Sequence, residues 1–497
     1  MCSITVPFHF AEESIEIDAA PDLIPTIEAA VRSLVPNVKF GTGRRLNARA
    51  IWRAQGLAVF VSLAGGESWD CLDTEILDDG YGETDRRRRG KERVRLGVRR
   101  VIERTFGLSA GPWGILTGVR PTKLVHSLFD RGFSQAKVRH LLQEVYGVFP
   151  DKIALLEEVI IEQRRHFLPN PNNPVSIYVG IPFCPTRCTY CSFAAYPLAS
   201  HGHLMSAFLQ ALRLEILAVG SLLRESGVQV ESIYLGGGTP TTVQGGKLVE
   251  LLALIDAELK TAHTREYTVE AGRPETLGGE TLAVLKDAGV NRISINPQSM
   301  HDQTLHAIGR RHSVEQIRTA FGQARRVGIP IINMDIILGL PGEKPAHVEQ
   351  TLQEIAALGP DNLTVHSLAL KRASVLKREQ AYLQVAQEQG EMMAALSRKY
   401  ALAWAMKPYY LYRQRYILGD LENVGYARPE KECLYNIQMM EERQTIIALG
   451  GGGITKLVKP DQTLTRLINA KCPATYTQRI HGDLGSKINQ IRQHLLV

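Results

Sequence analysis

The sequence predicts a mixed α/β protein, in which a partial parallel (β/α)6 barrel follows an N-terminal α+β domain and precedes a C-terminal lobe. Between residues 169 and 395, short runs of β-branched residues alternate with longer helical runs, the pattern of parallel strands joined by right-handed crossover helices. Glycine follows three of these helices, at Gly289, Gly328 and Gly359, as is typical of helix C-termini. The expected strands are 176–181, 232–235, 267–271, 292–295, 331–338 and 362–367, and the expected helices are 203–224, 247–259, 279–287, 313–327 and 346–358.

The sequence pattern divides the chain into three parts. We expect the N-terminal α+β domain at 1–168, the barrel at 169–395 and the C-terminal lobe at 396–497. The Pro- and Asn-rich run at 168–174 predicts a linker. After about residue 372 the regular alternation stops, which favours a separate lobe. In the first part, the expected strands are 3–10 and 57–63, and the expected helices are 94–106, 123–129, 134–146 and 151–167.

The composition indicates an ordinary globular protein. Apolar residues make up 44% of the chain and charged residues 22%, which excludes a mostly disordered or collagen-like chain. Because no run of 18 apolar residues occurs, we expect no membrane-spanning helix. The first 20 residues lack a basic segment followed by an apolar one, so we expect no secretory signal and place the protein in the cytoplasm.

The positive charge of the chain is concentrated in one segment. Residues 81–125 contain 12 Lys and Arg against four Asp and Glu, while the whole chain carries a net charge of +7. This segment is either an anion-binding face or a solvated helix face. Val94, Val98, Val101 and Ile102 form an apolar stripe at helical spacing, and no aromatic residues alternate with the arginines. The pattern therefore favours the solvated face over a nucleic-acid interface.

Three cysteines form a compact motif at the end of the first predicted barrel strand. The segment YVGIPFCPTRCTYCSF places Cys184, Cys188 and Cys191 in a CxxxCxxC spacing, and three thiolates this close can hold one metal centre. A disulfide does not fit a reducing compartment or an odd number of seven cysteines. A structural zinc site is closed by four protein ligands, and each of the remaining cysteines stands alone, far from these three in the sequence. The spacing therefore favours a [4Fe–4S] cluster with one open iron, and zinc is the alternative.

Further polar motifs follow the other predicted strands, at the end of a β/α barrel where chemistry takes place. The glycines of GGGTPT, residues 236–241, allow close approach and offer N–H groups to a carboxylate, or they form only a tight turn. Glu270 could accept hydrogen bonds from a ribose or an ammonium, and the nearby Arg273 and Glu275 could be a surface ion pair. Asp335 stands alone in an apolar run, so it needs a partner.

The cysteine motif and its position resemble those of the radical S-adenosylmethionine (SAM) superfamily. The surrounding residues are similar to the oxygen-independent coproporphyrinogen III oxidases and their relatives, most of all to the HemZ type, with the haem chaperones of the HemW type as a sibling group. The resemblance covers about residues 90–497. It implies a [4Fe–4S] cluster on the three cysteines and SAM contacts at Tyr178, Tyr190, Gly237, Gly238, Thr239, Glu270, Gln298, Arg310, Asp335 and Ala369.

The resemblance also implies a reaction. In the family, SAM binds the open iron, an electron from an unidentified low-potential donor splits it, and the resulting 5′-deoxyadenosyl radical removes hydrogen from a propionate of coproporphyrinogen III. Loss of CO2 leaves a vinyl group, and two rounds give protoporphyrinogen IX. Lys371, Arg372 and Arg413 are candidate cations for the four substrate carboxylates. Residues 408–427 either cover the substrate or form a packed aromatic core.

Two positions depart from the family pattern. Phe193 stands where the established bacterial oxidases carry a fourth cysteine, and Gly180 stands where the family often has histidine.

The leading hypothesis for the function of the protein is an enzyme of porphyrin synthesis. The alternatives are a haem chaperone, which would bind haem without turnover, and a radical SAM enzyme acting on RNA, which the basic segment would serve. The sequence favours a tetrapyrrole partner over a nucleic acid or a membrane.

Overall fold

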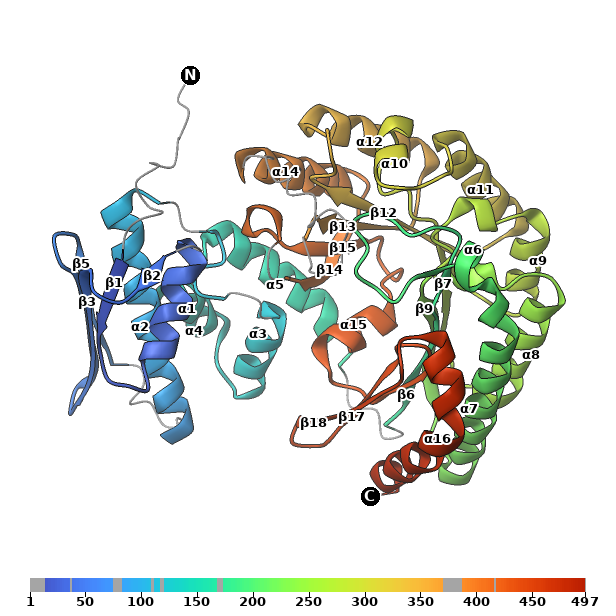
Figure 1. The fold of residues 1–497 in the computed structure, drawn as a ribbon, viewed down its shortest axis with the longest axis horizontal. Coiled ribbons are helices and arrows are strands. Elements are labelled where there is room, and N and C mark those ends of the chain that lie inside the picture. Colours follow the sequence, from blue (N-terminus) through green and yellow to red (C-terminus); the bar gives the residue numbers. More distant parts are fainter. Residues whose placement is uncertain are drawn as a thin grey trace. The chain divides into compact units, whose positions relative to one another are not determined.

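The computed structural model describes residues 14–35, 38–74, 83–108, 111–116, 120–167, 173–369, 387–414 and 417–496 (Figure 1). The chain divides into two compact units. One comprises residues 1–119 and 124–156, and the other comprises residues 120–123 and 157–497. The predicted strand at 3–10 lies outside the described residues.

The first unit is an α+β domain, as predicted. Its five-stranded sheet has the order β2-β1-β3-β4-β5, and the apolar stripe of α2 packs on this sheet, with Val94, Val98, Val101 and Ile102 fully buried. The strands are β1 (Ser14–Asp18), β2 (Lys39–Phe40), β3 (Arg44–Arg53), β4 (Gly56–Leu63) and β5 (Ser68–Asp73), and the helices from here into the second unit are α1 (Ile24–Leu34), α2 (Glu83–Phe106), α3 (Pro121–Asp130), α4 (Gln135–Glu144) and α5 (Pro150–Arg164).

The basic segment differs from the predicted solvated face. Arg89 and Arg93 are buried, and their Nε atoms lie 3.3 and 2.7 Å from the buried Asp73 carboxylate. Arg99 is buried as well and binds Glu103 at 2.7 Å. A buried carboxylate requires compensating charge, so part of this charge is structural. The exposed face of α2 keeps Arg86, Arg87 and Arg88.

The second unit is built on an eleven-stranded sheet of order β14-β15-β13-β12-β11-β10-β9-β6-β16-β17-β18. Six consecutive parallel strands confirm the predicted (β/α)6 core, and helices α7, α8, α9 and α11 cover its outer side (Figure 1). The six strands are β6 (Val175–Ile181), β9 (Val230–Gly237), β10 (Glu266–Val269), β11 (Arg292–Ser294), β12 (Ile331–Leu338) and β13 (Asn362–Ser367). The helices are α6 (Leu198–His201), α7 (Met205–Ser226), α8 (Gly246–Leu259), α9 (Gly279–Asp287), α10 (Asp302–Ala307), α11 (Val314–Val327) and α12 (Pro345–Leu358).

The residues expected to form a separate C-terminal lobe instead extend the barrel sheet at both edges. β15 pairs antiparallel with β13, and β16 pairs parallel with β6. The edges of an open six-stranded sheet carry unpaired backbone groups, and these added strands satisfy them. The C-terminal elements are α14 (Gln387–Ala403), β14 (Lys407–Tyr412), β15 (Asn423–Ala427), α15 (Leu434–Glu441), β16 (Ile446–Gly450), β17 (Ile454–Val458), β18 (Leu464–Ile468) and α16 (Pro473–Leu495).

The short helix α15 fills the amino-terminal end of the barrel. Glu266, the first residue of β10, accepts hydrogen bonds from the N–H groups of Leu434 (2.8 Å) and Tyr435 (3.2 Å) at the start of α15. Tyr435 stacks on Tyr234 and Tyr178, with ring centroids 4.3 and 5.9 Å away. The amino-terminal end of the barrel lumen is therefore closed by a floor, which consists of these tyrosine rings and of α15 hydrogen-bonded to β10.

One described helical stretch, Leu198–Ser226, is long and apolar enough to cross a membrane, although we expected none. Half of its apolar window is buried within the unit, where α7 packs against α8 and α16 (Figure 1). Length and composition are therefore weak evidence for a membrane span here.

Candidate functional site

The three cysteines lie on one loop at the carboxyl end of the first parallel strand. After β6, the short strand β7 (Phe183–Cys184) pairs with β8 (Tyr196–Pro197), so residues 184–195 form a closed cysteine loop. The Cys191 N–H donates to the Cys188 carbonyl at 3.2 Å and turns the chain between these two cysteines. Cys184 and Cys188 are each 8% exposed, and Cys191 is more exposed.

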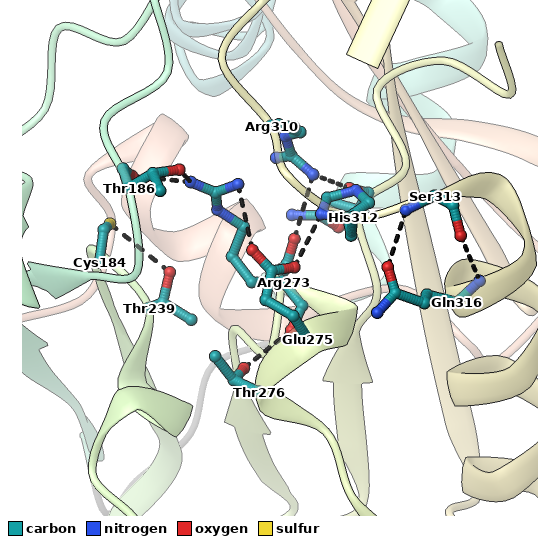
Figure 2. Close-up of polar contacts among 12 residues, drawn as sticks. Cys184, Thr186, Thr239, Arg273, Glu275, Thr276, Arg310, His312, Ser313 and Gln316 are labelled. Atoms are coloured by element: carbon teal, nitrogen blue, oxygen red, sulfur yellow. Dashed lines mark hydrogen bonds and ion pairs between the residues drawn. The ribbon is translucent and has the colours of Figure 1, made fainter. Parts of the chain in front are cut away.

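The buried Arg273 holds this loop from the neighbouring barrel strands. Its Nη2 donates to the carbonyl and the hydroxyl of Thr186, both at 2.7 Å, and its Nη1 lies 3.4 Å from Glu275 (Figure 2). His312 Nδ1 lies 2.7 Å from the other oxygen of Glu275. Burial raises the pKa of Glu275, but His312 and Arg273 outweigh it and lower that pKa below its ordinary value. Arg273 and Glu275 are thus an interior clamp and not a surface pair.

The buried Arg310 is the second clamp. It donates to the Tyr190 hydroxyl at 3.3 Å, to the Gly272 carbonyl at 3.3 Å and to the Asn296 carbonyl. Burial raises the pKa of the Cys188 thiol, but the charges of Arg310 and Arg273 and hydrogen bonds from Tyr190 and Arg310 outweigh burial and lower that pKa. Because thiolates are the metal-binding form of cysteine, the two arginines prepare Cys188 for a metal.

The other two thiols are less readily ionised. Burial raises the pKa of Cys184 to about 11 and also raises that of Cys191. In the described residues, no three Cys, His, Asp or Glu side chains stand close enough to hold a single metal ion. In a [4Fe–4S] cluster each cysteine binds a different iron, so three soft thiols beside two guanidinium groups fit such a cluster. The described part of the chain brings no fourth ligand that a closed zinc site would need.

Gly238 and Thr239, which directly follow β9, bond to the segment that leads into the cysteine loop. The Gly238 and Thr239 N–H groups donate to the Ile181 and Phe183 carbonyls at 2.8 and 2.7 Å. A Cβ at Gly238 would lie 2.4 Å from the Phe183 oxygen and 3.0 Å from Cys184 Sγ. The Thr239 hydroxyl lies 3.5 Å from the same sulfur. The N–H groups of Gly238 and Thr239 are therefore occupied by the chain's own carbonyl groups in this structure.

Glu270 lies inside the lumen beside the tyrosine floor. The Tyr234 hydroxyl donates to it at 2.5 Å, and a Cβ at Gly236 would lie 2.9 Å from its carboxylate. Burial, together with the negative charge of Asp335, raises the pKa of Glu270 to about 7. Tyr178 faces the same space through its stacking on Tyr234, with ring centroids 6.2 Å apart. A carboxyl group that titrates near neutral pH becomes ionised more readily when a cationic ligand binds beside it.

Asp335 has the partners that its burial requires. The Asn333 amide donates to it at 2.7 Å, and His366 Nε2 lies 3.6 Å from its other oxygen. The Tyr412 hydroxyl lies 3.2 Å from Nδ1 of the same histidine. Burial raises the pKa of Asp335, but hydrogen bonds and charge from His366, with further hydrogen bonds from Asn333 and Thr364, outweigh it and lower that pKa.

Gln298 is held in an unusual backbone conformation between β11 and β12. Its φ is +67°, a left-handed value that non-glycine residues rarely adopt. Its N–H donates to the Asp335 carbonyl at 2.9 Å, and its carbonyl accepts from Ile337 at 3.0 Å. The side chain is 7% exposed, and within the described residues its Oε1 has no hydrogen-bond partner. A buried, unpartnered amide oxygen is suited to a ligand donor.

The remaining predicted positions are less closely tied to the lumen. Ala369 forms an isolated antiparallel bridge with Ile417. Arg413 is buried and bound to the Asp420 side chain and carbonyl, so it braces a loop, while Lys371 and Arg372 lie outside the described residues. A Cβ at Gly180 would lie 2.6 Å from the Gly451 oxygen, which excludes the histidine frequent in the family at this position.

Four residues of the site escape the sequence analysis: Thr186, His312, His366 and Tyr435. Thr186 and His312 complete the Arg273 clamp, and His366 and Tyr435 face the lumen. The position of His366 could have been recognised as facing the lumen. His366 is a polar residue on a strand in which side chains alternate between the two faces, and its neighbours Val365 and Ser367 are buried. Thr186 and Tyr435 depend on contacts between segments more than 80 residues apart. His312 depends on its contact with Glu275 from a different strand connection, and local sequence patterns encode none of these contacts.

Comparison with known proteins agrees with this geometry. The sequence profile of the Radical SAM superfamily matches residues 178–355. The chain is 42% identical over 391 residues to the oxygen-independent coproporphyrinogen-III oxidase-like protein HemZ of Bacillus subtilis, covering 77% of each chain. It is 32% identical over 222 residues to the haem chaperone HemW of B. subtilis, covering 44% of this chain and 57% of HemW.

A solved structure shares the fold. Coproporphyrinogen III oxidase (HemN) from Escherichia coli, described as a radical SAM enzyme, superposes with a TM-score of 0.52 at 20% identity, over 64% of this chain and 72% of HemN. At that identity the likeness concerns the fold alone. The barrel seen here therefore has the same fold as the matching part of that structure.

Proposed function

Because the chain belongs to the radical SAM superfamily and, within it, to the group of HemZ-type coproporphyrinogen III oxidase-like proteins, we propose that it converts two propionates of coproporphyrinogen III to vinyl groups, giving protoporphyrinogen IX. The family binds a [4Fe–4S] cluster and SAM. Bound together, these cofactors would supply a 5′-deoxyadenosyl radical that takes hydrogen from a propionate; CO2 would then leave with one electron, which an external one-electron acceptor must take up. The observation that carries the proposal is the cysteine loop, clamped by two buried arginines at the mouth of a parallel barrel.

In this proposal the chain's own residues bind and orient the cofactors. Cys184, Cys188 and Cys191 hold the cluster, while Arg273 and Arg310 fix the loop and favour the thiolate of Cys188. The Asp335 carboxylate, together with Glu270 when it is ionised, attracts a cationic sulfonium nucleotide into the lumen. The Gln298 amide oxygen, which has no partner within the described residues, accepts one of its hydrogen bonds. Tyr178, Tyr190, Gly237, Gly238, Thr239, Arg310 and Ala369 complete the proposed SAM environment.

The choice of substrate rests on the names of relatives and on access. Besides HemZ, the oxygen-independent coproporphyrinogen III oxidase of Pseudomonas aeruginosa is 33% identical over 199 residues, 40% of this chain and 43% of that protein. Since α15 fills one end of the lumen, a substrate reaches SAM from the carboxyl ends of the strands. We place the reaction in the cytoplasm, where reducing conditions keep the thiols available.

The test is a complete anaerobic reaction. The purified protein is reconstituted with iron and sulfide and mixed with SAM, dithionite and coproporphyrinogen III, and the products are separated by chromatography. We expect protoporphyrinogen IX and two molecules of 5′-deoxyadenosine for each molecule formed, and neither product from a Cys188→Ala variant. A wild-type protein that makes 5′-deoxyadenosine without any decarboxylated tetrapyrrole would exclude the proposed reaction.

The second candidate is a haem chaperone, favoured by the HemW relatives and by Phe193 at the position of the fourth cysteine. A chaperone would bind haem tightly, seen as a Soret band that persists through gel filtration, and would turn over no coproporphyrinogen. The same reconstituted sample tests both, because turnover and haem retention are measured independently.

A further inference from the structure

We propose that His366 and Tyr412 are positioning residues that hold the Asp335 carboxylate in place for SAM, so that the C-terminal strand β14 takes part in binding the cofactor. We call these three side chains the lumen relay. The inference rests on the proposed function, since it assumes that SAM binds in this lumen. It goes further by naming the residues that keep one of the proposed SAM contacts ionised and oriented.

The two oxygens of the Asp335 carboxylate have different partners. Oδ1 accepts from the Asn333 amide at 2.7 Å, and the Thr364 hydroxyl fixes Asn333 by donating to its amide oxygen at 3.1 Å. Oδ2 faces His366 Nε2 at 3.6 Å. In the parallel pairing of β12 with β13, Asp335 lies opposite Thr364, so His366, two residues later, projects from the same face. His366 is thus the partner that β13 supplies for Oδ2.

The His366 ring is held in turn by Tyr412, whose hydroxyl lies 3.2 Å from Nδ1. Because the pKa of Asp335 is lowered, its carboxylate offers only acceptors, and Nε2 carries a hydrogen toward it. In the neutral ring, Nδ1 accepts from the Tyr412 hydroxyl, which keeps its proton because burial and the charge of Asp335 raise the pKa of Tyr412. In the charged ring, Nδ1–H donates to the phenol oxygen instead. The relay is therefore connected in both states of the histidine.

One buried asparagine fixes the backbone beside His366 and at Tyr412. The Asn423 side chain donates to the Tyr412 carbonyl at 3.2 Å, and its oxygen accepts from the Ser367 N–H at 2.9 Å. Asn423 is 1% exposed and lies on β15, which stands between β13 and β14 in the sheet (Figure 1). The Tyr412 ring also stacks on Tyr410, with ring centroids 6.2 Å apart. Supporting side chains that are themselves fixed make a binding geometry precise.

The relay joins two regions of the chain. Asp335 belongs to the residues 178–355 that match the Radical SAM profile, whereas His366 and Tyr412 both lie beyond residue 355. Tyr412 is on β14, which pairs antiparallel with β15 outside the parallel core. A strand outside the matched region therefore reaches a proposed cofactor contact inside it.

The relay matters because Asp335 shares the lumen with Glu270. The charge of Asp335 raises the pKa of Glu270, and burial acts on Asp335 in the same direction. The side chains of Asp335 and His366 are 17% and 26% exposed, so a ligand in the lumen can reach the carboxylate. Without His366, burial and the Glu270 charge favour the protonated acid, and the carboxyl group is free to rotate. Both changes weaken the attraction for a cation.

The experiment measures SAM binding to the cluster-loaded protein by anaerobic equilibrium dialysis. We expect His366→Leu to weaken SAM binding about tenfold, while His366→Gln, which keeps an N–H donor, stays within about threefold of wild type. Tyr412→Phe removes only the hydroxyl and should weaken binding about fivefold. The matched control is Tyr400→Phe, which removes a hydroxyl that donates to Glu349 at 3.3 Å between α14 and α12. This control should bind SAM as wild type does.

A double variant separates a relay from independent contacts. If Tyr412 acts on Asp335 through His366, then adding Tyr412→Phe to His366→Leu should cause no further loss of SAM affinity. Losses that add up in the double variant would show that Tyr412 acts on its own, and they would overturn the relay.

The remaining outcomes distinguish the relay from the proposed function. Wild-type SAM affinity in His366→Leu and Tyr412→Phe overturns the relay, as does a loss of tetrapyrrole turnover at unchanged SAM affinity. If His366→Leu loads no iron, the comparison of Tyr412→Phe with Tyr400→Phe decides, and equal affinities overturn the relay. A wild-type protein that loads iron and binds no SAM overturns the proposed function and the relay with it. A wild-type protein that binds SAM but decarboxylates no tetrapyrrole overturns the proposed reaction only, because the relay is measured by SAM affinity.

Discussion

Glu270 and Asp335 are two buried carboxyl groups in one lumen with opposite protonation behaviour. Burial and the charge of Asp335 raise the pKa of Glu270 to about 7. Asp335 is buried as well, but hydrogen bonds and charge from His366 lower its pKa. Asp335 is thus ionised across the neutral range, while Glu270 gains its charge as pH rises through about 7. A cationic ligand binds best to the state in which both are ionised.

This difference predicts how SAM affinity depends on pH. Since the folded pKa of Glu270 is raised to about 7, its negative charge is mostly absent at pH 6 and mostly present at pH 8. We expect SAM to bind the cluster-loaded protein about tenfold more tightly at pH 8 than at pH 6, measured by anaerobic equilibrium dialysis. Glu270→Gln should bind SAM weakly at both values. A Gln variant with the wild-type pH dependence would assign the titration to another group.

Single residues show where sequence reasoning succeeds. The cysteines, Glu270 and Asp335 can be recognised because a reactive or charged residue at the end of an apolar strand is a local pattern. The roles of Thr186 and His312 cannot, because each acts through a contact with Arg273 or Glu275 that exists only after the strands are in register.

At the scale of elements, the end of β9 and the start of the cysteine loop are fitted closely together. Gly238 packs against the Phe183 backbone, and Cys184 accepts from Thr239. The six parallel strands and the five longer helices that follow them could be predicted from alternation and helix-ending glycines. The added strands β15 and β16, which flank the parallel core, could not, because they pair with strands about 60 and 270 residues earlier in the chain.

The close fit predicts a sharp effect of one methyl group. In Gly238→Ala the new Cβ would lie 2.4 Å from the Phe183 oxygen and 3.0 Å from Cys184 Sγ, so the loop must move and the cluster should be lost or incomplete. Gly246→Ala, at the start of α8, meets no atom within 4 Å and should be neutral. Iron content per folded chain, with circular dichroism as the folding check, separates the two. Full iron loading in Gly238→Ala would show that the loop tolerates displacement.

At the scale of the whole barrel unit, the C-terminal helix closes the structure through one buried ion pair. Glu215 on α7 is fully buried and lies 2.7 Å from Lys487 on α16. It also accepts from the Gly450 N–H at 2.7 Å and the Tyr476 hydroxyl at 2.6 Å. One carboxylate thus ties α7, the end of β16 and α16 together, which explains why the last hundred residues form one unit with the barrel.

Removing one partner of this pair should destabilise the unit strongly. Lys487→Met leaves the Glu215 charge uncompensated in the interior, and we expect a loss of about 3–5 kcal/mol in the free energy of unfolding. Arg479→Met removes an exposed ion pair with Asp483 on the same helix and should cost less than about 1 kcal/mol. Denaturant titration measures both. If the two variants lost the same free energy of unfolding, the buried Glu215–Lys487 pair would contribute no more to stability than the exposed pair.

The central claim is that the three cysteines of the loop hold an iron–sulfur cluster with one iron open to SAM. The direct measurement is electron paramagnetic resonance of the dithionite-reduced, reconstituted protein before and after SAM is added. We expect about four irons per chain, a cluster signal that changes with SAM, its loss in Cys188→Ala and its retention in Cys71→Ala. Bound zinc in place of iron, or a cluster signal that SAM leaves unchanged, would contradict the claim.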